Sequence, residues 1–528
     1  MQRGEATIAA GRGGAETSTV AQEIAAAAAA HPDTVVEIHS DTHPDATTLA
    51  DLFAESRRVA AGLAGLGVGP GDIVAVQVPN WRACFTAHAA IWLRGAVVLP
   101  IVPIYGPAEV AYIAGQSGAR AIILARRIRS RDTADTLAAV AGLPGLAQRI
   151  VVGEPLPGTV PYTELTCGAM GLDPVEANPD DCCLIVYTSG TTARPKGVRH
   201  THAGLLGEIR AMDEMRSTTP GRSVLSLFPS GHIAGTLGIL RTLCQPGATY
   251  VMDTWDPETA ARLVDKHAIA ASAGAPIHLG GILDVAEREN LDLSSLAEFV
   301  TGAAGVAGAL IRRADRFGVG AFRCYGSSEH PTVSSGRPDD PLDKRADTDG
   351  RICPGTEVRI VDDAGRDVAP GEEGEILTRG VELFRGYTDD AHTRAAMTDG
   401  WFRTGDVGRL DADGYLTITD RKKDIIVRGG ENISSKEVED VLAAHPAVAE
   451  AAAVGAPDET YGERVCAFVI LNDGHSFGIE DAAKHFAQHG LARQKTPERI
   501  VVVDEFPRTA SGKVQKHVLR AQLTGSSD

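Results

Sequence analysis

Long apolar runs and cysteine patterns are both missing from this sequence. No window of the 528-residue chain approaches the roughly eighteen apolar residues that a membrane span requires. The opening stretch, MQRGEATIAAGRGG, lacks the apolar core of a signal peptide. The eight cysteines show neither a disulfide framework nor the paired CxxC spacing of a zinc site, so we expect reduced, mostly structural thiols. These absences predict a cytoplasmic protein in which residues 1–18 form a flexible N-terminus.

An excess of positive charge is also absent. The chain has 51 lysines and arginines against 69 aspartates and glutamates, which gives a formal net charge of −18. Nonspecific nucleic-acid binding requires clustered cations that neutralise phosphates, so this balance argues against a nucleic-acid partner. A polyanionic small ligand is compatible with the sequence if local cations and Mg²⁺ neutralise it.

The chain is too long for one compact core, and its patterns change twice. Residues 34–420 alternate short β-branched runs with longer alanine- and leucine-rich helical segments, which is typical of α/β layers. Beyond residue 350, the alternation of apolar and polar residues indicates a β-rich subdomain. After residue 420, a capped amphipathic helix and a strand indicate a small α+β domain. We therefore predict an N-terminal domain over 19–420 and a C-terminal domain over 424–528.

The stretch IVYTSGTTARPKGV, residues 185–198, gathers hydroxyl groups, glycines and one lysine. It follows an apolar strand and precedes a helix that we expect to begin near His202. Backbone N–H groups of a glycine-rich turn, hydroxyl donors and a cation together suit phosphate oxygens, and the alternative is a flexible surface turn. The candidate phosphate-binding residues are Thr188, Ser189, Gly190, Thr191, Thr192 and Lys196.

This stretch resembles the YTSGTTGxPKG signature of the adenylate-forming superfamily, which includes acyl-CoA synthetases, adenylation domains and luciferases. Ala193 stands where that signature has glycine. A second stretch, YGSSE, resembles the superfamily's YGxTE motif. The resemblance implies that Tyr325 packs on adenine and that Glu329 helps to hold Mg²⁺. It also places Gly326, Ser327 and Ser328 at the nucleotide.

Two further motifs follow in the superfamily's order. WFRTGD, which ends at Asp406, resembles the segment whose aspartate binds the ribose hydroxyls, and Arg421 in DRKKD resembles its arginine partner. PRTASGKVQKHVLR resembles the C-terminal lysine motif and places Lys513 at the catalytic position. Each stretch alone could be a turn, a helix cap or an exposed loop. Together they make the chain similar to this superfamily over roughly residues 34–520.

The resemblance implies an acyl-CoA synthetase of the superfamily's α/β fold, with ATP and coenzyme A as cosubstrates and Mg²⁺ as cofactor. A carboxylate is first joined to AMP with release of pyrophosphate, and coenzyme A then attacks the acyl-adenylate. Fixed cations and donors lower the barrier of the first step, because negative charge builds on the α-phosphate. The C-terminal domain of this superfamily rotates between the steps, here about a hinge at 421–423. Lys423 would be the pivot, or else a solvated link residue, and Gly430 and Glu431 would face coenzyme A.

The acyl group is predicted from two short stretches. His232 in FPSGHIAGTLG resembles a histidine beside the acyl pocket and joins Lys513 and Glu329 as a candidate catalytic residue; the alternative is a core-facing side chain. Small, apolar neighbours predict an uncharged acyl group, and no acid in this run could pair with an amino group. The acyl-pocket candidates are His232, Ile233, Gly235, Gly302, Ala303 and Ala304. We expect a medium-chain, alicyclic or aromatic acid.

Other functions are compatible with the same motifs. An acyl-AMP ligase would pass the acyl group to a carrier protein, but the restraining insertion of such relatives is not evident between Glu329 and Thr404. A luciferase-like oxygenase has no specific signature in this chain. A noncatalytic nucleotide sensor would be free to lose Lys513 or Glu329, and both are present. Acylation of Lys513, which would delete its charge, and a homodimer are further hypotheses.

Overall fold

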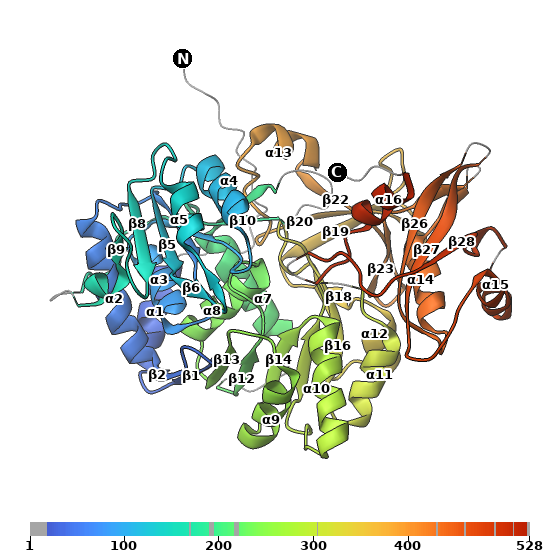
Figure 1. The fold of residues 1–528 in the computed structure, drawn as a ribbon, viewed down its shortest axis with the longest axis horizontal. Helices are drawn as coiled ribbons and strands as arrows, with labels where there is room; N and C mark the ends of the chain where they lie inside the picture. Colours follow the sequence, from blue (N-terminus) through green and yellow to red (C-terminus); the bar gives the residue numbers. More distant parts are fainter. Residues whose placement is uncertain are drawn as a thin grey trace. The chain divides into compact units, whose positions relative to one another are not determined.

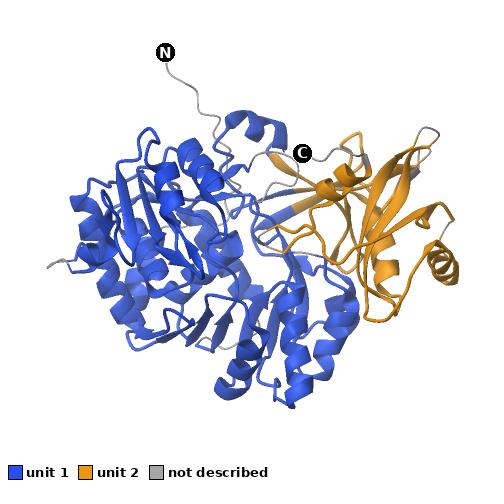
Figure 2. Cartoon of the chain, in the orientation of Figure 1, with its two compact units in different colours: residues 1–188, 195–357, 378–400 blue, residues 189–194, 358–377, 401–528 orange. Residues whose placement is uncertain are grey.

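The computed structural model describes most of the chain, and Figure 1 traces its elements. The described residues are 18–167, 171–188, 195–215, 221–303, 305–428, 431–458, 461–489, 491, 493–509 and 512–524. The chain divides into two compact units, which Figure 2 colours separately. Unit 1 comprises residues 1–188, 195–357 and 378–400, and unit 2 comprises residues 189–194, 358–377 and 401–528. The predicted domain limits of 19–420, 421–423 and 424–528 stay a prediction.

A nine-stranded sheet in unit 1 has a parallel centre, in which β1, β13, β12, β14, β15 and β16 pair in turn. Its order is β18 (Arg351–Ile352), β17 (Ser334–Ser335), β16 (Ala321–Tyr325), β15 (Glu298–Thr301), β14 (Ala271–Gly274), β12 (Val224–Ser226), β13 (Thr249–Met252), β1 (Val35–His39) and β2 (Asp45–Thr48). Because parallel strands end at one edge, the segments that follow β12, β15 and β16 meet at the same side of this sheet.

A seven-stranded sheet forms the second layer of strands in unit 1. Its order is β11 (Gly197–Thr201), β10 (Cys182–Tyr187), β4 (Val97–Pro100), β3 (Ile73–Gln77), β5 (Ala121–Ala125), β8 (Gln148–Val152) and β9 (Val160–Pro161). Only the outer pair, β10 with β11, is antiparallel among the described pairs of this sheet. The apolar run in β5 is buried along its whole length, as expected for a parallel strand covered on both faces.

The helices of unit 1 cover these sheets (Figure 1). They are α1 (Val20–Ala30), α2 (Leu49–Gly65), α3 (Arg82–Leu93), α4 (Pro107–Ser117), α5 (Ala134–Val140), α6 (Tyr162–Thr166), α7 (His202–Met215), α8 (Ile233–Cys244), α9 (Pro257–His267), α10 (Pro276–Glu289), α11 (Gly308–Arg316), α12 (Leu342–Asp347) and α13 (Asp390–Ala396). One hydrophobic core joins Ile38 of β1 and Val76 of β3 with side chains of α3 and α8, so these helices lie in the shared interior. Unit 1 also contains a two-stranded ribbon of β6 (Arg127–Ile128) and β7 (Arg131–Asp132).

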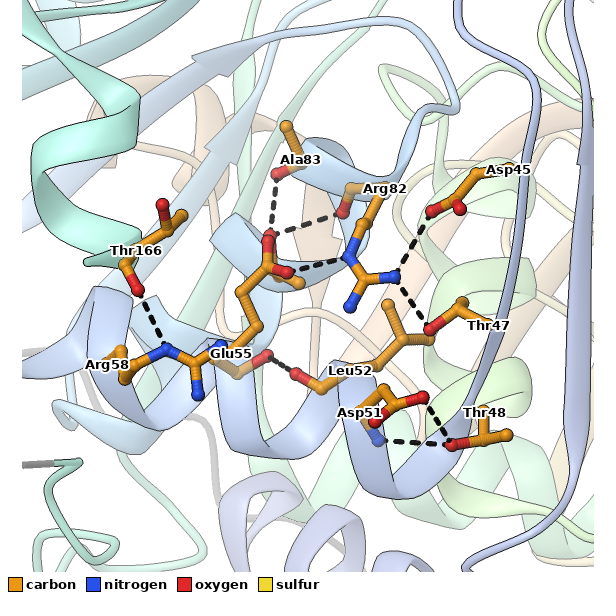
Figure 3. A network of polar contacts seen from close by, with 12 residues as sticks. Asp45, Thr47, Thr48, Asp51, Leu52, Glu55, Arg58, Arg82, Ala83 and Thr166 are labelled. Atoms are coloured by element: carbon orange, nitrogen blue, oxygen red, sulfur yellow. Dashed lines mark hydrogen bonds and ion pairs between the residues drawn. The ribbon is translucent and has the colours of Figure 1, made fainter. Parts of the chain in front are cut away.

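The start of the buried helix α3 is fixed by Arg82, as Figure 3 shows. Its Nε donates to Glu55 Oε2 of α2 at 2.6 Å. Its Nη1 donates to Thr47 Oγ1 at 2.8 Å and to Asp45 Oδ2 at 3.2 Å on β2. A guanidinium has five donors in a fixed fork, so one side chain can join three elements. This network is structural, and it holds α2, α3 and β2 together.

Unit 2 contains most of one five-stranded sheet and all of another. The first has the order β19 (Thr356–Val361), β20 (Gly374–Gly380), β22 (Trp401–Leu410) and β21 (Met397–Thr398), with β23 (Leu416–Arg421) paired to β22. The second has the order β25 (Glu431–Ile433), β24 (Ile426–Arg428), β27 (Gly462–Leu471) and β26 (Val448–Asp458), with β28 (Arg499–Val502) paired to β27. The unit's helices are α14 (Ser435–Ala443), α15 (Ile479–Gln488), the 3₁₀ turn η1 (Arg493–Lys495) and α16 (Lys516–Thr524).

The cysteines differ in their exposure. Cys167 is exposed, whereas Cys84, Cys183, Cys353 and Cys466 are buried. Burial raises the pKa of the Cys84 thiol to about 12. No helix within the described ranges has both the length and the apolar character needed to cross a membrane.

Candidate active site

The predicted phosphate loop joins two antiparallel strands. Tyr187, the last residue of β10, is paired with Gly197, the first residue of β11. Thr188 N donates to Lys196 O at 2.9 Å, and Lys196 N donates to Thr188 Oγ1 at 3.2 Å, so the two ends of the loop are fastened together. Ser189, Gly190, Thr191 and Thr192 lie outside the described residues.

The helix expected near His202 does begin there, but it does not follow the turn directly. The sequence led us to expect a strand, a turn and a helix, whereas the structure inserts β11 between turn and helix. β11 has only five residues, and its hydrogen bonds to β10 decide its conformation. The helix N-terminus that the sequence pattern suggested for this loop is therefore separated from it by the length of β11.

Glu329 lies in a loop that a hydrogen bond closes at its base. Val333 N donates to Tyr325 O at 2.9 Å, where β16 ends. A Cβ at Gly326 would meet Pro331 O at 1.9 Å, so only glycine fits at this position. Ser327 Oγ accepts hydrogen bonds from the backbone N–H groups of Glu329 and His330, each at 3.2 Å. The YGSSE stretch is thus a folded loop that holds Glu329 by its backbone, and we name residues 325–333 the acid loop.

Tyr387 is a close partner of Glu329 that the sequence motifs do not reveal. Its hydroxyl donates to Glu329 Oε1 at 2.7 Å, although the two residues are 58 positions apart in the chain. Burial, and then the Glu329 carboxylate, raise the pKa of Tyr387, so the hydroxyl keeps its proton as a donor. The Lys196 ammonium lies 5.0 Å from the centroid of the Tyr387 ring. The structure therefore brings together a carboxylate, a phenol and a cation from three segments of unit 1.

Glu329 suits a magnesium ion only in company with phosphate. No group of three or more histidine, cysteine, aspartate or glutamate side chains that could hold a metal ion occurs among the described residues. Mg²⁺ is ordinarily held in proteins by one or two carboxylates together with substrate phosphates and water. The single half-buried carboxylate of Glu329, with one oxygen oriented by Tyr387, fits that donor set.

The back of the acid loop is held by a neutral histidine, His200. His200 Nε2 lies 2.8 Å from Ser328 O, and burial lowers the pKa of His200 to about 4. An uncharged ring can donate one N–H to this carbonyl. Ser328, predicted at the nucleotide, therefore contacts β11 through its backbone.

The described acyl-pocket candidates lie at the start of α8 and after the end of β15. His232 is the N-cap of α8, and Gly302 directly follows β15. A Cβ at Gly235 would meet Pro229 O at 1.9 Å, and one at Gly302 would meet Cys324 Sγ at 2.7 Å. The sequence suggested that small residues at these positions leave open space for the acyl group. The structure gives another reason for their small size, because both glycines permit close packing. Ala303 has a positive φ of 64°, Ile233 begins α8, and Ala304 lies outside the described residues.

Asp406 and Arg421 form a pair within unit 2. They lie opposite each other on β22 and β23, with Arg421 Nε 2.7 Å from Asp406 Oδ1. The next residue, Lys422, bonds Glu375 Oε2 and Asp363 Oδ1, each at 3.1 Å. Burial, and then Arg421, lower the pKa of Lys423. The predicted ribose-binding pair is therefore contiguous with the predicted hinge.

Lys513 lies in a tight turn before α16. Its backbone N–H donates to Thr509 Oγ1 at 3.1 Å, and Thr509 N donates to Lys513 O at 2.8 Å. Gly512 has a φ of 84°, a left-handed conformation that glycine adopts without strain. Gly430 lies outside the described residues; Glu431 begins β25, and its side chain is not described.

Helix α16 connects the Lys513 turn with the predicted hinge inside unit 2. Lys516 Nζ bonds Glu439 Oε1 and Ser435 Oγ of α14, each at 2.7 Å. Arg520 Nη2 donates to Asp424 Oδ1 at 2.7 Å and to Lys423 O at 3.2 Å. We name these Lys516 and Arg520 bonds the α16 clasp. It fixes the element after Lys513 to the residues around 423–424.

Comparison with known proteins agrees with this assignment of motifs. The model of the AMP-binding enzyme family matches residues 24–388, and the model of the AMP-binding enzyme C-terminal domain matches residues 437–513. The first match covers well over half of the chain. The sequence is also 33% identical to the "Medium-chain fatty-acid--CoA ligase" of Escherichia coli, over 94% of this chain and 89% of that protein.

A second relative and a solved structure extend the comparison. The chain is 35% identical to the "3-[(3aS,4S,7aS)-7a-methyl-1,5-dioxo-octahydro-1H-inden-4-yl]propanoyl:CoA ligase" of Rhodococcus jostii, over 90% of this chain and 93% of that protein. The crystal structure of ATP-bound MatB from Rhodopseudomonas palustris superposes with a TM-score of 0.87 at 26% identity, covering 96% of this chain and 99% of MatB. The predicted fold class and the predicted enzyme class, an ATP-dependent, AMP-forming acid–thiol ligase, are confirmed. The chain belongs to the AMP-binding enzyme family of adenylate-forming proteins.

Proposed function

We propose that this enzyme converts an apolar carboxylic acid, ATP and coenzyme A into acyl-CoA, AMP and pyrophosphate. In the first step the carboxylate oxygen attacks the α-phosphorus, and the bond to pyrophosphate breaks. In the second step the thiolate of coenzyme A attacks the acyl carbon, and AMP leaves. The names of the relatives from Escherichia coli and Rhodococcus jostii support coenzyme A as the acceptor.

The observation that carries this proposal is the contact between Glu329 and Tyr387, with Lys196 over the same ring. We assign the phosphates to Thr188–Thr192 and Lys196, the adenine to Tyr325, and Mg²⁺ to Glu329. When bound, Mg²⁺ supplies positive charge that neutralises phosphate oxygens. Tyr387 keeps one carboxylate oxygen in a fixed direction, because its buried hydroxyl stays protonated and donates. A preoriented carboxylate binds the metal–nucleotide pair at little cost in reorganisation.

In unit 2 we assign the ribose hydroxyls to Asp406 and Arg421. The carboxylate is held as an acceptor by the 2.7 Å contact with Arg421, so one of its oxygens keeps a defined direction. Lys513 supplies positive charge to the carboxylate and α-phosphate oxygens, Lys423 is the pivot of the hinge at 421–423, and Gly430 and Glu431 face coenzyme A. The domains over 19–420 and 424–528 are part of the same proposal.

For the acid we propose a medium-sized apolar group beside His232, Ile233, Gly235, Gly302, Ala303 and Ala304. The half-buried apolar side chain of Ile233 at the start of α8 supports it, as do the fatty-acid and alicyclic substrates in the names of the two relatives. The second candidate acceptor is the thiol of a carrier protein. We also propose a cytoplasmic location and a homodimer, neither of which follows from membership of the family.

One assay tests the function. Purified protein is incubated with MgATP and a panel of acids, with and without coenzyme A, and pyrophosphate and acyl-CoA are measured. We expect acid-dependent pyrophosphate release and a CoA thioester, with a medium-sized apolar acid preferred over acetate and amino acids. Adenylate that accumulates beside unused coenzyme A would assign a carrier protein as acceptor. ATP binding without acid-dependent pyrophosphate release would contradict the ligase proposal.

A further inference from the structure

A buried polar cluster joins four segments of unit 1 behind the acid loop. Glu208 lies on α7 and Arg241 on α8, and they bond through Arg241 Nη2 and Glu208 Oε2 at 2.6 Å. Thr332 of the acid loop donates its hydroxyl to Glu208 Oε1 at 3.0 Å. The same residue donates its backbone N–H to Glu382 Oε2 at 3.2 Å, in the segment that follows β20. Thr332 is thus held by two carboxyl groups at once.

The two acids of this cluster are not equivalent. Glu208 is 2% exposed and is paired with Arg241, whereas Glu382 is 0% exposed. Glu382 Oε1 is buried and has no hydrogen-bond partner within the described ranges. One arginine neutralises only one of the two carboxylates, so a second ionised acid would be a buried, uncompensated charge. Glu382 therefore belongs in the structure as a neutral carboxyl group.

Burial and the nearest acid both favour the neutral form of Glu382. Burial, and then Glu208 of α7, raise the pKa of Glu382 well above its ordinary value, and the hydrogen bond from Thr332 N and then Arg241 of α8 oppose this only in part. Cys353 is a further titratable neighbour, a buried thiol whose own pKa is raised by burial. Arg337 interacts electrostatically with that thiol. A neutral thiol beside Glu382 adds no charge that would compensate an ionised carboxyl.

The cluster is connected to Glu329 from both sides. On one side, Thr332 belongs to the acid loop itself. On the other side lies the segment 381–387, in which Phe384 N donates to Glu329 O at 2.8 Å and the Tyr387 hydroxyl donates to Glu329 Oε1 at 2.7 Å. The segment is packed tightly on α7, because a Cβ at Gly207 would meet Val381 Cγ1 at 2.8 Å. A displacement of Glu382 would therefore reach both the backbone and the carboxylate of Glu329.

We infer that Glu382 is a positioning residue for the reaction: by fastening Thr332 to the segment 381–387, it sets the direction in which Glu329 presents its carboxylate to a metal–nucleotide pair. It acts as a neutral group, with one oxygen that accepts from Thr332 N. An amide has the same shape and also offers an acceptor oxygen, so glutamine should replace it, whereas alanine should not. The inference rests on the proposed role of Glu329 as the metal-binding residue.

The test measures metal binding directly. Free Mn²⁺ is counted by electron paramagnetic resonance in the presence of a nonhydrolysable ATP analogue, for the wild type, Glu382→Ala and Glu382→Gln, each checked for folding by circular dichroism. We expect Glu382→Ala to weaken Mn²⁺ binding roughly tenfold, as loss of an outer partner of a metal ligand does, and Glu382→Gln to bind within about twofold of the wild type at neutral pH. As the pH rises, the Mn²⁺ affinity of the wild type should fall, because Glu382 can ionise. The Mn²⁺ affinity of Glu382→Gln should not show this fall, because an amide cannot ionise.

Glu55→Gln is the matched control, because Glu55 is a carboxylate of the same unit that bonds Arg82 in the structural network of Figure 3. It should change thermal stability without changing Mn²⁺ affinity. If Glu382→Ala does not fold, Glu382→Met, which keeps most of the side-chain volume and removes the acceptor for Thr332 N, takes its place. Unchanged Mn²⁺ affinity in the folded variant, or equal loss in Glu382→Gln and Glu382→Ala, would overturn the inference. A wild type that binds no Mn²⁺–nucleotide would instead contradict the proposed function.

Discussion

The acid loop of unit 1 and the Lys513 turn of unit 2 are held by different kinds of contact. The acid loop is anchored by buried groups: His330 and Glu382 are 0% exposed and Thr332 is 8% exposed. The Lys513 turn is anchored through the α16 clasp by ion pairs whose side chains keep 14–28% of their surface in contact with water. Removing a partner from a buried polar group costs much free energy, whereas water can take over part of the contacts of a partly exposed ion pair. We therefore expect the loop that presents Glu329 to be held more rigidly than the turn that carries Lys513.

The largest expected effect is on the rate of adenylate formation, when the charge of Lys513 is removed. Lys513→Ala should slow adenylate formation by on the order of a hundredfold, the scale for loss of one oriented charge-stabilising group. Thioester formation from supplied acyl-adenylate should persist, because that step needs no cation at this position. Pyrophosphate release and acyl-CoA formation are measured separately. Equal damage to both half-reactions would contradict the assignment, and Lys484→Ala, an exposed lysine on α15, is the control.

A smaller effect is expected on the metal side when one hydroxyl is removed. Tyr387→Phe deletes the donor to Glu329 Oε1 and leaves the ring next to Lys196. We expect a roughly tenfold rise in the Mg²⁺ concentration for half-maximal rate, the typical cost of losing an outer partner of a metal ligand. Tyr162→Phe is the control, because its buried hydroxyl bonds Thr86 in the structural core. An unchanged Mg²⁺ requirement in Tyr387→Phe would show that the hydrogen bond does not orient Glu329.

The free energy of unfolding should depend on pH through the buried acid Glu382, which helps to hold the acid loop. The pKa of Glu382 is raised in the folded state, so this acid binds its proton more tightly there than in the unfolded chain. Its contribution to stability is complete below its ordinary pKa of 4.5 and is lost as the pH rises toward the folded value. The loss is about 1.4 kcal/mol per pH unit in that window. The melting temperature of Glu382→Gln should therefore gain on the wild type as the pH rises; a constant difference from pH 5 to 9 would contradict this.

The smallest effect is expected at the α16 clasp. Arg520→Ala removes bonds to Asp424 Oδ1 and Lys423 O. The backbone N–H groups of Asp424 and Ile425 both donate to Arg421 O, so their hydrogen exchange reports on this region. A partly exposed ion pair contributes about 1 kcal/mol or less to stability, so this exchange should become faster by no more than about fivefold. High salt should produce a similar change in the wild type. Arg366→Ala, which removes an exposed pair with Asp362, should leave these amides unchanged. A much larger acceleration would mean that the clasp is not adjustable.

The order of the motifs and the change from α/β layers to a smaller α+β region could both be predicted from the sequence. These features depend on neighbouring residues, and short stretches record them well. The strand β11 was missed because its five residues are defined by pairing with β10, which sequence spacing does not reveal.

Tyr387, Thr332 and Glu382 were missed for a related reason. Their roles come from contacts across the fold: Glu382 bonds Thr332 50 positions away, and Tyr387 bonds Glu329 58 positions away. A glutamate between Val381 and Leu383 resembles any strand-end polar residue until its burial is known. The GYTDD stretch after an apolar strand was a weak signal for Tyr387, since a tyrosine beside a glycine turn often packs on a ligand or a core.

The uneven exposure of the cysteines has a practical consequence for experiments on this enzyme. A maleimide dye reacts with the thiolate, so thiols that are buried and protonated react slowly. Cys167 is exposed, whereas burial raises the pKa of Cys84 to about 12 and that of Cys182 to about 11. The natural protein should therefore take up a fluorophore first at Cys167, which offers a labelling position without an engineered cysteine.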